Sequence, residues 1–231
     1  MVPKNLRPPG PAEIRRLTAL LSRPAEDAAP ALLGTLIVRA FRGRLLAAQI
    51  VETEAYLGAK DPASHAFRGR TGRTVPLWGP PGMIYVYFVY GMHYCLNLAA
   101  SLPGVPECVL IRAADPLEGS GLSPDSCRGP GRLCRALRID SRESGRNLFE
   151  PESRLYLREG VRPRSVLVSP RVGIRLAADR PLRFYDAESL AVSHRSPPPT
   201  LRVSSRARRR AAGSRVGRGR DSGGTFPKRP H

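Results

Sequence analysis

The segment IYVYFVYGMHYCLN, residues 84–97, indicates the fold more clearly than any other part of the chain. Residues 83–90 are rich in β-branched and aromatic side chains, which strands favour. Gly91-Met92 then predicts a hairpin turn, and residues 93–100 predict the returning strand. The segment therefore predicts an antiparallel hairpin.

Strand-like runs lie on both sides of this hairpin. They cover residues 32–41, 45–56, 108–114, 155–158, 166–169, 172–176 and 182–185. The runs do not alternate with helices as in a dinucleotide-binding fold, so we expect an antiparallel arrangement. The fold class expected is mixed α/β (α+β): a single compact domain around a curved antiparallel sheet with a protruding β-hairpin.

Helices and chain ends complete this expectation. Residues 12–22 carry apolar side chains at helical spacing, Pro24 and Pro30 are expected to bracket a loop, and the glycine-rich residues 129–139 predict the start of a helix. We expect a flexible arm over residues 1–11 and one folded domain over 12–195. The Arg/Gly/Ser/Pro-rich residues 196–231 predict a disordered tail.

The chain is strongly basic, with 38 Lys and Arg against 19 Asp and Glu in 231 residues and a net charge of +19. Residues 196–231 hold ten of the basic residues and one of the acidic ones, so the body is basic without them. This balance predicts a polyanionic partner, above all nucleic acid. The alternative is a solvated basic surface that binds no such partner.

Other classes of protein are disfavoured by composition. No apolar run approaches the roughly 20 residues that span a bilayer, and the N-terminus lacks the apolar core of a signal peptide. We expect a cytoplasmic protein, nucleoid-associated if bacterial, with no membrane partner. The four cysteines form no CxxC pair, so we expect no structural zinc. We also expect no other metal and no cofactor.

The stretch IVETEAYLG, residues 50–58, is the first candidate site. Alternate strand residues share a face, so Glu52, Glu54 and Tyr56 point the same way. Two carboxylates beside an aromatic ring suggest a hydrolytic site. Periodicity does not choose between the glutamates, and a half-exposed acidic strand face is the alternative.

An unusual loop follows over residues 58–82, rich in Gly, Pro and Arg. Loops of this length inside a compact domain are usually functional or disordered. Its His65 is surrounded in sequence by Arg68, Arg70 and Arg73, which favours contacts with phosphates or bases over metal binding.

Tyrosines and one arginine form the next candidates. Tyr85 and Tyr87 share a strand face, and Tyr90 lies at the presumed hairpin tip, where aromatic rings could stack on bases. Tyrosines that simply fill a sheet are the alternative. Arg112 follows a buried apolar run, so we expect it to pair with a carboxylate or an anion.

Taken together, these motifs resemble the alkyladenine (3-methyladenine) DNA glycosylase family, the type with its own mixed α/β fold rather than a helix-hairpin-helix. The resemblance spans roughly residues 30–186. It rests on VETEAYLG, RGRTGRT, GPPGMIYVYFVYGMHYCLN, VLIRAADPLEG, GPGRLCRALRI, RVGI and LRFY, in this order.

The resemblance implies roles for residues of the base pocket. Glu54 is implied to activate the water, which resolves the choice that periodicity leaves open. Tyr56 and Tyr87 are implied to form two aromatic walls around a flipped base, with His65 in contact with it. Asn97 is implied to disfavour the exocyclic amine of normal guanine.

The resemblance also implies contacts with the rest of the nucleic acid. Arg112 is implied to lie near the water and the phosphate of the flipped nucleotide. Tyr90 is implied to be a wedge in the minor groove, and we assign Met92 beside it to DNA binding. Arg68, Arg70 and Arg73 are expected to bind DNA as well.

The activity implied is excision of alkylated or deaminated purines such as 3-methyladenine, 7-methylguanine and hypoxanthine from double-stranded DNA. We expect a monomer, the natural form for sliding along DNA. Lys60 is the only lysine near the candidate site, so we expect a monofunctional glycosylase without lyase activity. The alternatives are a non-catalytic DNA- or RNA-binding protein on the same fold and an RNA-associated protein that binds through its tail.

Overall fold

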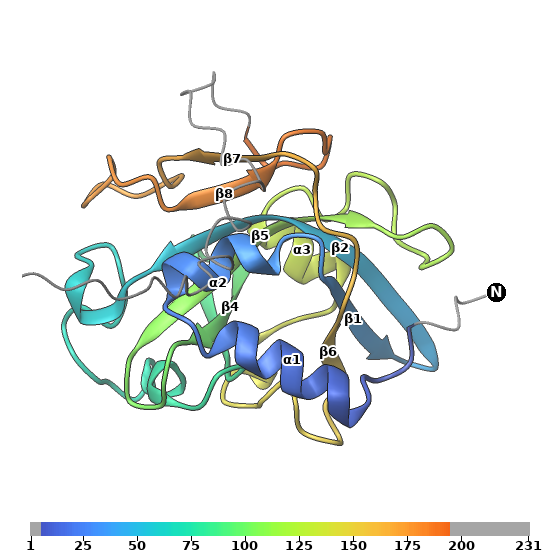
Figure 1. The fold of residues 1–231 in the computed structure, drawn as a ribbon, viewed down its shortest axis with the longest axis horizontal. Helices are drawn as coiled ribbons and strands as arrows, with labels where there is room; N and C mark the ends of the chain where they lie inside the picture. The colour runs from blue at the N-terminus through green and yellow to red at the C-terminus, as the bar shows by residue number, and fades with distance from the viewer. Residues whose placement is uncertain (1–5, 195–231) are drawn as a thin grey trace, which may run out of the picture.

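The computed structural model describes residues 6–194, and these residues form one antiparallel sheet covered by short helices (Figure 1). The main path of the sheet runs β3-β4-β5-β2-β1-β6, with β8 pairing with β2 and β7 with β8. The mixed α/β fold around an antiparallel sheet is confirmed. The strands are β1 (Leu36–Phe41), β2 (Arg44–Tyr56), β3 (Ile84–Val89), β4 (His93–Ala100), β5 (Glu107–Pro116), β6 (Leu155–Arg158), β7 (Val166–Ser169) and β8 (Arg183–Asp186).

The helices are short. They are α1 (Pro11–Leu21), α2 (Ala25–Leu32) and α3 (Pro130–Ala136), with single 3₁₀ turns at η2 (Gly58–Lys60), η3 (Val75–Trp78) and η4 (Ser141–Glu143). Among residues 6–194, no helix is long and apolar enough to cross a membrane.

The two faces of the central strands have different compositions. One face is apolar and belongs to the main core, with Ile84 and Val86 of β3, Leu96 and Leu98 of β4, and Val109 and Ile111 of β5. The alternate residues of the same strands carry tyrosine, cysteine, asparagine and arginine. Because neighbouring residues of a strand point to opposite faces, the sheet separates the core from the polar face.

Helix α2 covers the apolar face where we expected a loop between Pro24 and Pro30. Ala25, Ala28 and Ala29 are completely buried, and their small side chains allow the helix to lie close to the sheet. Thr53 of β2 donates a hydrogen bond to the carbonyl of Ala29 at 2.9 Å, which satisfies one of the open carbonyls of the last turn. Figure 1 shows α1 and α2 side by side on this face.

Strand β2 changes its neighbour halfway along its length. Residues 44–49 pair with β1, whereas Glu52–Glu54 pair with β8. The register with β5 shifts on both sides of Glu52, which is typical of a bulge that bends a strand and redirects its side chains. The second half of β2 therefore leaves β1 and pairs with β8, which in turn pairs with β7.

The hairpin expected from residues 84–97 is present, but its turn is one residue longer than predicted. Val89 and His93 are the last paired residues, so Tyr90, Gly91 and Met92 form the tip. Tyr90 has a φ of 52° and Gly91 one of 66°. Tyr90 has left the strand, and its side chain is 79% exposed.

Three further segments differ from their expected structure. Residues 32–35, expected to begin the first strand, precede β1, and Leu32 is the last residue of α2. Residues 172–176 are not a strand; they follow β7 as a loop. Leu6 is fully buried and its carbonyl accepts a hydrogen bond from the Tyr156 hydroxyl at 2.7 Å, so residues 6–11, expected to be flexible, are anchored to the domain. The tail expected over residues 196–231 lies outside the described residues.

Candidate active site

Arg112 on β5 joins the two glutamates of β2. Its Nε donates to Glu52 Oε1 at 3.0 Å, and its Nη1 lies 3.3 Å from Glu54 Oε1. Both glutamates are fully buried. The predicted shared face of Glu52 and Glu54 is therefore confirmed, and so is the pairing expected for Arg112. The alternative of an acidic face in solvent is excluded.

Glu52 is held from all sides. Its Oε1 accepts hydrogen bonds from Arg112, Arg183 and the Ser193 hydroxyl, and its Oε2 accepts one from the Ser193 backbone N–H at 2.6 Å. Arg183 also donates to Ser169 at 3.1 Å. A carboxylate enclosed by so many donors is an anchor for arginines, which leaves it few lone pairs for a water molecule.

Glu54 has fewer partners and lies behind the wall of a cavity. Its Oε1 accepts from the Val172 backbone N–H at 2.7 Å, and its Oε2 accepts from the Tyr56 hydroxyl at 2.9 Å. Burial raises the pKa of Glu54 above its ordinary value, and Arg112 and these two hydrogen bonds offset part of the rise. Its three partners, Tyr56, Arg112 and Val172, all line the larger cavity.

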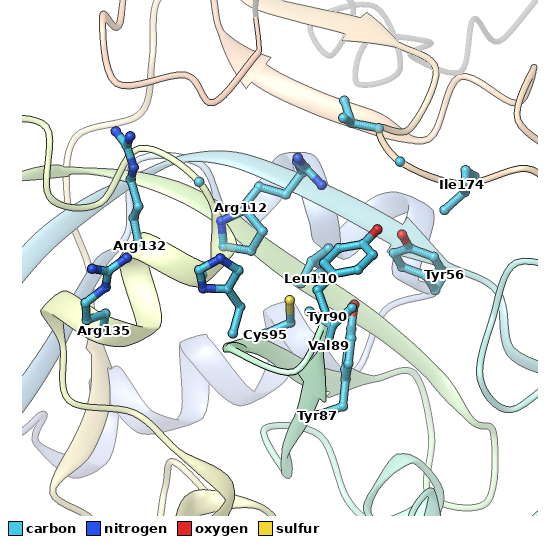
Figure 2. Close-up of a pocket in the computed structure, with 16 residues that line it drawn as sticks. Tyr56, Tyr87, Val89, Tyr90, Cys95, Leu110, Arg112, Arg132, Arg135 and Ile174 are labelled. Carbon is cyan, nitrogen blue, oxygen red and sulfur yellow. The ribbon is translucent and has the colours of Figure 1, made fainter.

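This larger cavity has a volume of about 550 Å³ and runs from Tyr56 to α3 (Figure 2). Figure 2 shows the rings of Tyr56, Tyr87 and Tyr90 gathered at one end, below the segment that carries Ile174. Arg132 and Arg135 of α3 stand at the other end. The cavity thus joins an aromatic end to a cationic end, as an anionic ligand with an aromatic group would require.

A smaller cavity of about 190 Å³ adjoins the larger one and shares the walls Tyr56, Tyr87 and Tyr90 with it. His65, Tyr85, Asn97 and Cys108 are among its other lining residues. Aromatic walls with a few polar groups between them are typical of a site for a flat heterocycle. Tyr56, His65, Tyr87 and Asn97, the four residues predicted for a base pocket, all line this cavity.

His65 is fixed by two of the tyrosines. Its Nδ1 lies 2.9 Å from the Tyr85 hydroxyl, and its ring stands edge-on to Tyr87 with 4.5 Å between centroids. Burial and the nearby charge of Arg73 lower the pKa of His65. The imidazole is therefore neutral at neutral pH, with one nitrogen able to accept a hydrogen bond.

Asn97 is fixed by the backbone of the hairpin. Its side-chain Nδ2 donates to the carbonyls of Tyr85 at 3.2 Å and Cys95 at 3.4 Å, and Asn97 is 3% exposed. An amide held in this way does not rotate to fit different ligands. Asn97 is therefore a rigid part of the wall of the smaller cavity.

The residues expected to bind DNA lie outside the smaller cavity or at its edge. Tyr90 and Met92 are 79% and 69% exposed at the hairpin tip. Arg68, Arg70 and Arg73 are exposed residues of the loop and line neither cavity. The structure thus separates a buried group around Glu54 from an exposed group at the tip and the loop.

Several residues at the site were not predicted from the sequence. Val172–Ile174 line the larger cavity where we expected a strand, and Gly173 and Ile174 line the smaller one as well. Arg132 and Arg135 close the cationic end of the larger cavity. The GPGRLC motif gave a signal for α3, because a glycine-rich helix start can present N–H groups to phosphate. For Val172 the sequence offered only an apolar run, which does not separate a strand from a loop.

The pair Arg171–Asp61 was also missed. Arg171 donates to the two carboxylate oxygens of Asp61 at 2.5 and 2.9 Å, and both side chains are fully buried. The guanidinium lies over the Tyr56 ring, 4.6 Å from its centroid. A polar residue in a loop gives no sign in the sequence that it will be buried behind an aromatic wall.

Comparison with known proteins gives a consistent result. The sequence model of the family described as methylpurine-DNA glycosylase matches residues 19–190. A protein of Synechococcus elongatus is 46% identical over 178 residues, covering 76% of this chain and 89% of its own. A protein of Methanocella arvoryzae is 40% identical over 188 residues, covering 76% and 94%. One of Anaeromyxobacter dehalogenans is 44% identical over 184 residues, covering 78% and 86%. All three carry the name "Putative 3-methyladenine DNA glycosylase".

Proposed function

The chain belongs to the methylpurine-DNA glycosylase family, and we propose that it excises alkylated or deaminated purines from duplex DNA. The substrates proposed are bases of the 3-methyladenine, 7-methylguanine and hypoxanthine type, and the product is an abasic site. This is the family that the sequence motifs resemble.

The observation that carries the proposal is the position of Glu54. A buried carboxylate with a raised pKa lies directly behind Tyr56, Arg112 and Val172, which line the larger cavity. Its Oε2 accepts one hydrogen bond, from Tyr56, and retains a lone pair for a water molecule. Such a carboxylate is suited to act as a general base.

The base must first leave the duplex. A base stacked in DNA is out of reach of a buried carboxylate, so it has to rotate out at a cost of a few kcal/mol. In our proposal Tyr90 and Met92 enter the minor groove and fill the space left by the base. The flipped base enters the smaller cavity, where Tyr56 and Tyr87 stack on it, His65 contacts it and Asn97 disfavours the exocyclic amine of guanine.

For a cationic purine the chemistry then needs one carboxylate. Glu54 takes a proton from water, the water oxygen bonds to C1′ of the sugar, and the C1′–N bond breaks with its electron pair going to the base. Positive charge develops on the sugar as the C1′–N bond lengthens, as in glycoside hydrolysis, and Glu54 stabilises this charge while it is still ionised, before it takes the proton of the water. A cationic purine departs as a neutral base and needs no acid.

Arg112 supports this step without donating a proton. Burial lowers the pKa of Arg112, but Glu54 and Glu52 raise it more, so the guanidinium stays charged throughout. In our proposal it holds Glu54 in place from one side and attracts the phosphate of the flipped nucleotide on the other. Glu52 serves as its anchor.

The partner proposed is double-stranded DNA bound by a monomer. Arg68, Arg70 and Arg73 on the loop and Arg132 on α3 supply exposed or cavity-lining cations for phosphates. Arginine suits this role because its fork makes two hydrogen bonds to one phosphate.

We further propose a monofunctional glycosylase. Lys60 is exposed on η2 and lines neither cavity, so its amine is not placed to attack C1′. Borohydride trapping with lesion-containing duplex should give no covalent adduct. An adduct that Lys60→Ala abolishes would contradict this.

The decisive experiment is release of bases from methylated duplex DNA. Wild type should release them, and Glu54→Gln should lose roughly 10²–10⁴-fold in rate, the range for a general base. Glu152→Gln, an exposed change of the same chemistry, should match wild type. Glu52→Gln tests the other glutamate. Its stability must be measured by an unfolding curve as well, because the substitution weakens the buried hydrogen bonds of Glu52 with Arg112 and Arg183.

A protein on the same fold that only binds nucleic acid is the alternative. In that case wild type would bind lesion duplex and release nothing. A chain that lacks residues 196–231 distinguishes binding through the tail from binding through the site. If the site acts, the shortened chain still releases bases from methylated DNA.

A further inference from the structure

We propose that Arg171 is a specificity-determining residue, because its guanidinium behind the Tyr56 ring weakens the stacking of a cationic purine on that ring relative to a neutral one. The inference rests on the proposed function, since it concerns which lesions occupy the smaller cavity.

The position of the guanidinium is well defined. Its Cζ lies 4.6 Å from the centroid of the Tyr56 ring. Tyr56 lines both cavities, whereas Arg171 lines neither and has a fully buried side chain. The cation therefore covers the face of the ring that is turned away from the cavities, and the opposite face remains for a base.

Both members of this stack are fixed. Asp61 accepts two hydrogen bonds from Arg171, and the carbonyl of Ala55 accepts a third at 3.0 Å. Tyr56 is held at its far end by its hydroxyl, which donates to Glu54. A base that enters the cavity therefore meets a ring whose other face already carries a cation.

The electrostatic consequence follows from the charge distribution of the ring. An aromatic ring attracts cations to its faces through its quadrupole. A cation on one face repels a second cation on the other, and the low dielectric of a buried site strengthens the repulsion. A neutral base feels this repulsion far less, because it carries no net charge.

The surrounding charges do not remove the effect. Asp61 neutralises the net charge of Arg171, but the guanidinium is the member of the pair that faces the ring. Glu54 attracts a cationic base and is itself paired with Arg112. Among residues 6–194, no carboxylate lines the smaller cavity, so no acid of this part of the chain replaces the attraction that the Tyr56 ring loses.

The consequence concerns the lesion spectrum. N-methylated purines such as 7-methylguanine carry a positive charge in DNA, whereas hypoxanthine is neutral. Arg171 lowers the affinity of the smaller cavity for cationic lesions relative to its affinity for neutral ones. Without its charge, cationic lesions should gain relative to neutral ones.

The test compares 7-methylguanine and hypoxanthine in one duplex sequence under single-turnover conditions, with affinity for each duplex measured in parallel. Arg171→Gln removes the charge and keeps a donor for Asp61 and the Ala55 carbonyl. Asp61→Asn/Arg171→Met removes the whole pair without leaving a buried charge alone. For each variant we divide the value for 7-methylguanine by the value for hypoxanthine, both for the single-turnover rate and for the affinity. In both variants one of these two ratios should rise roughly three- to tenfold.

Arg171→Lys is the matched control, because it retains a charge beside the ring and should retain the ratio of wild type. A purely structural role for Arg171 would lower the values for both lesions together. An unchanged ratio in whichever neutral variant folds would therefore overturn the inference, while excision by wild type would leave the proposed function standing. Failure of wild type to bind or release either lesion would contradict the proposed function, and this inference with it.

Discussion

The hydroxyl of Tyr56 donates a 2.9 Å hydrogen bond to Oε2 of Glu54. A residue that lines both cavities is therefore bonded to the buried carboxylate behind it. The position of the Tyr56 ring and the acidity of Glu54, the candidate base, thus depend on one hydrogen bond.

Replacing Tyr56 by Phe should change the pH dependence of base release. The ring remains, but Glu54 loses a hydrogen bond that lowers its pKa. The acid limb of the pH–rate profile should move to higher pH, and the rate at neutral pH should fall severalfold. Tyr85→Phe removes a hydroxyl that contacts His65 instead, so it should leave the midpoint of that limb unchanged.

The wild-type profile should itself be shifted. Burial raises the pKa of Glu54 above 4.5, and the proposed base acts only when ionised. Release of a cationic lesion should therefore rise with pH through a midpoint above 4.5, measured as the single-turnover rate. A midpoint at or below the ordinary value for glutamate would contradict a buried base.

Glu54→Gln should lose activity and gain stability. A carboxyl whose folded pKa is raised destabilises the fold above that pKa, and the cost disappears as the pH falls to the unfolded value. The variant should be more stable at pH 7 by on the order of 1 kcal/mol, a rise of about 2–4 °C in Tm for a domain of this size. The gain should shrink toward pH 4.5. Scanning calorimetry at several pH values measures it, and Glu152→Gln should show no such gain.

Tyr90→Ala should separate DNA processing from stability. Tyr90 is 79% exposed, so its loss should change the free energy of unfolding by less than about 0.5 kcal/mol. Release from duplex should fall about tenfold or more because the wedge no longer fills the stack, whereas release from single-stranded DNA should fall much less. Leu102→Ala, also an exposed apolar residue, serves as the control. Equal losses on both substrates would rule out a wedge.

Gly131 on α3 should not tolerate a side chain. A Cβ there would lie 2.8 Å from Cγ of His93 at the base of the hairpin. Gly131→Ala should cost about 1–3 kcal/mol through this overlap, measured by denaturant unfolding. His93→Ala/Gly131→Ala should recover most of the loss. If the double variant is no better than the single one, the overlap is not the cause.

The sequence was informative where side chains alternate along strands. The period of two placed Glu52, Glu54 and Tyr56 on one face, and the structure confirms it because Arg112 contacts both acids. Periodicity did not distinguish the two glutamates. Their difference comes from β8 and Ser193, which enclose Glu52 and come from more than 130 residues further along the chain.

The errors arise where tertiary contacts override local signals. Two prolines suggested a loop over the segment that forms α2, but Pro24 precedes the helix, and packing against Thr53 stabilises it despite Pro30 inside. Residues 172–176 read as a strand because they are apolar. The first three of them, Val172–Ile174, instead line the larger cavity, and the N–H of Val172 donates a hydrogen bond to Glu54.

The contacts of Ser193 with Glu52 have a consequence for biosynthesis. Glu52 anchors Arg112, and its Oε2 is held by the backbone N–H of Ser193, near the end of the described residues. During translation, β2 and β5 leave the ribosome long before this serine. The contacts that hold Glu52 and Arg112 are therefore completed only after almost the whole domain has been made, and fragments released early lack this part of the candidate active site.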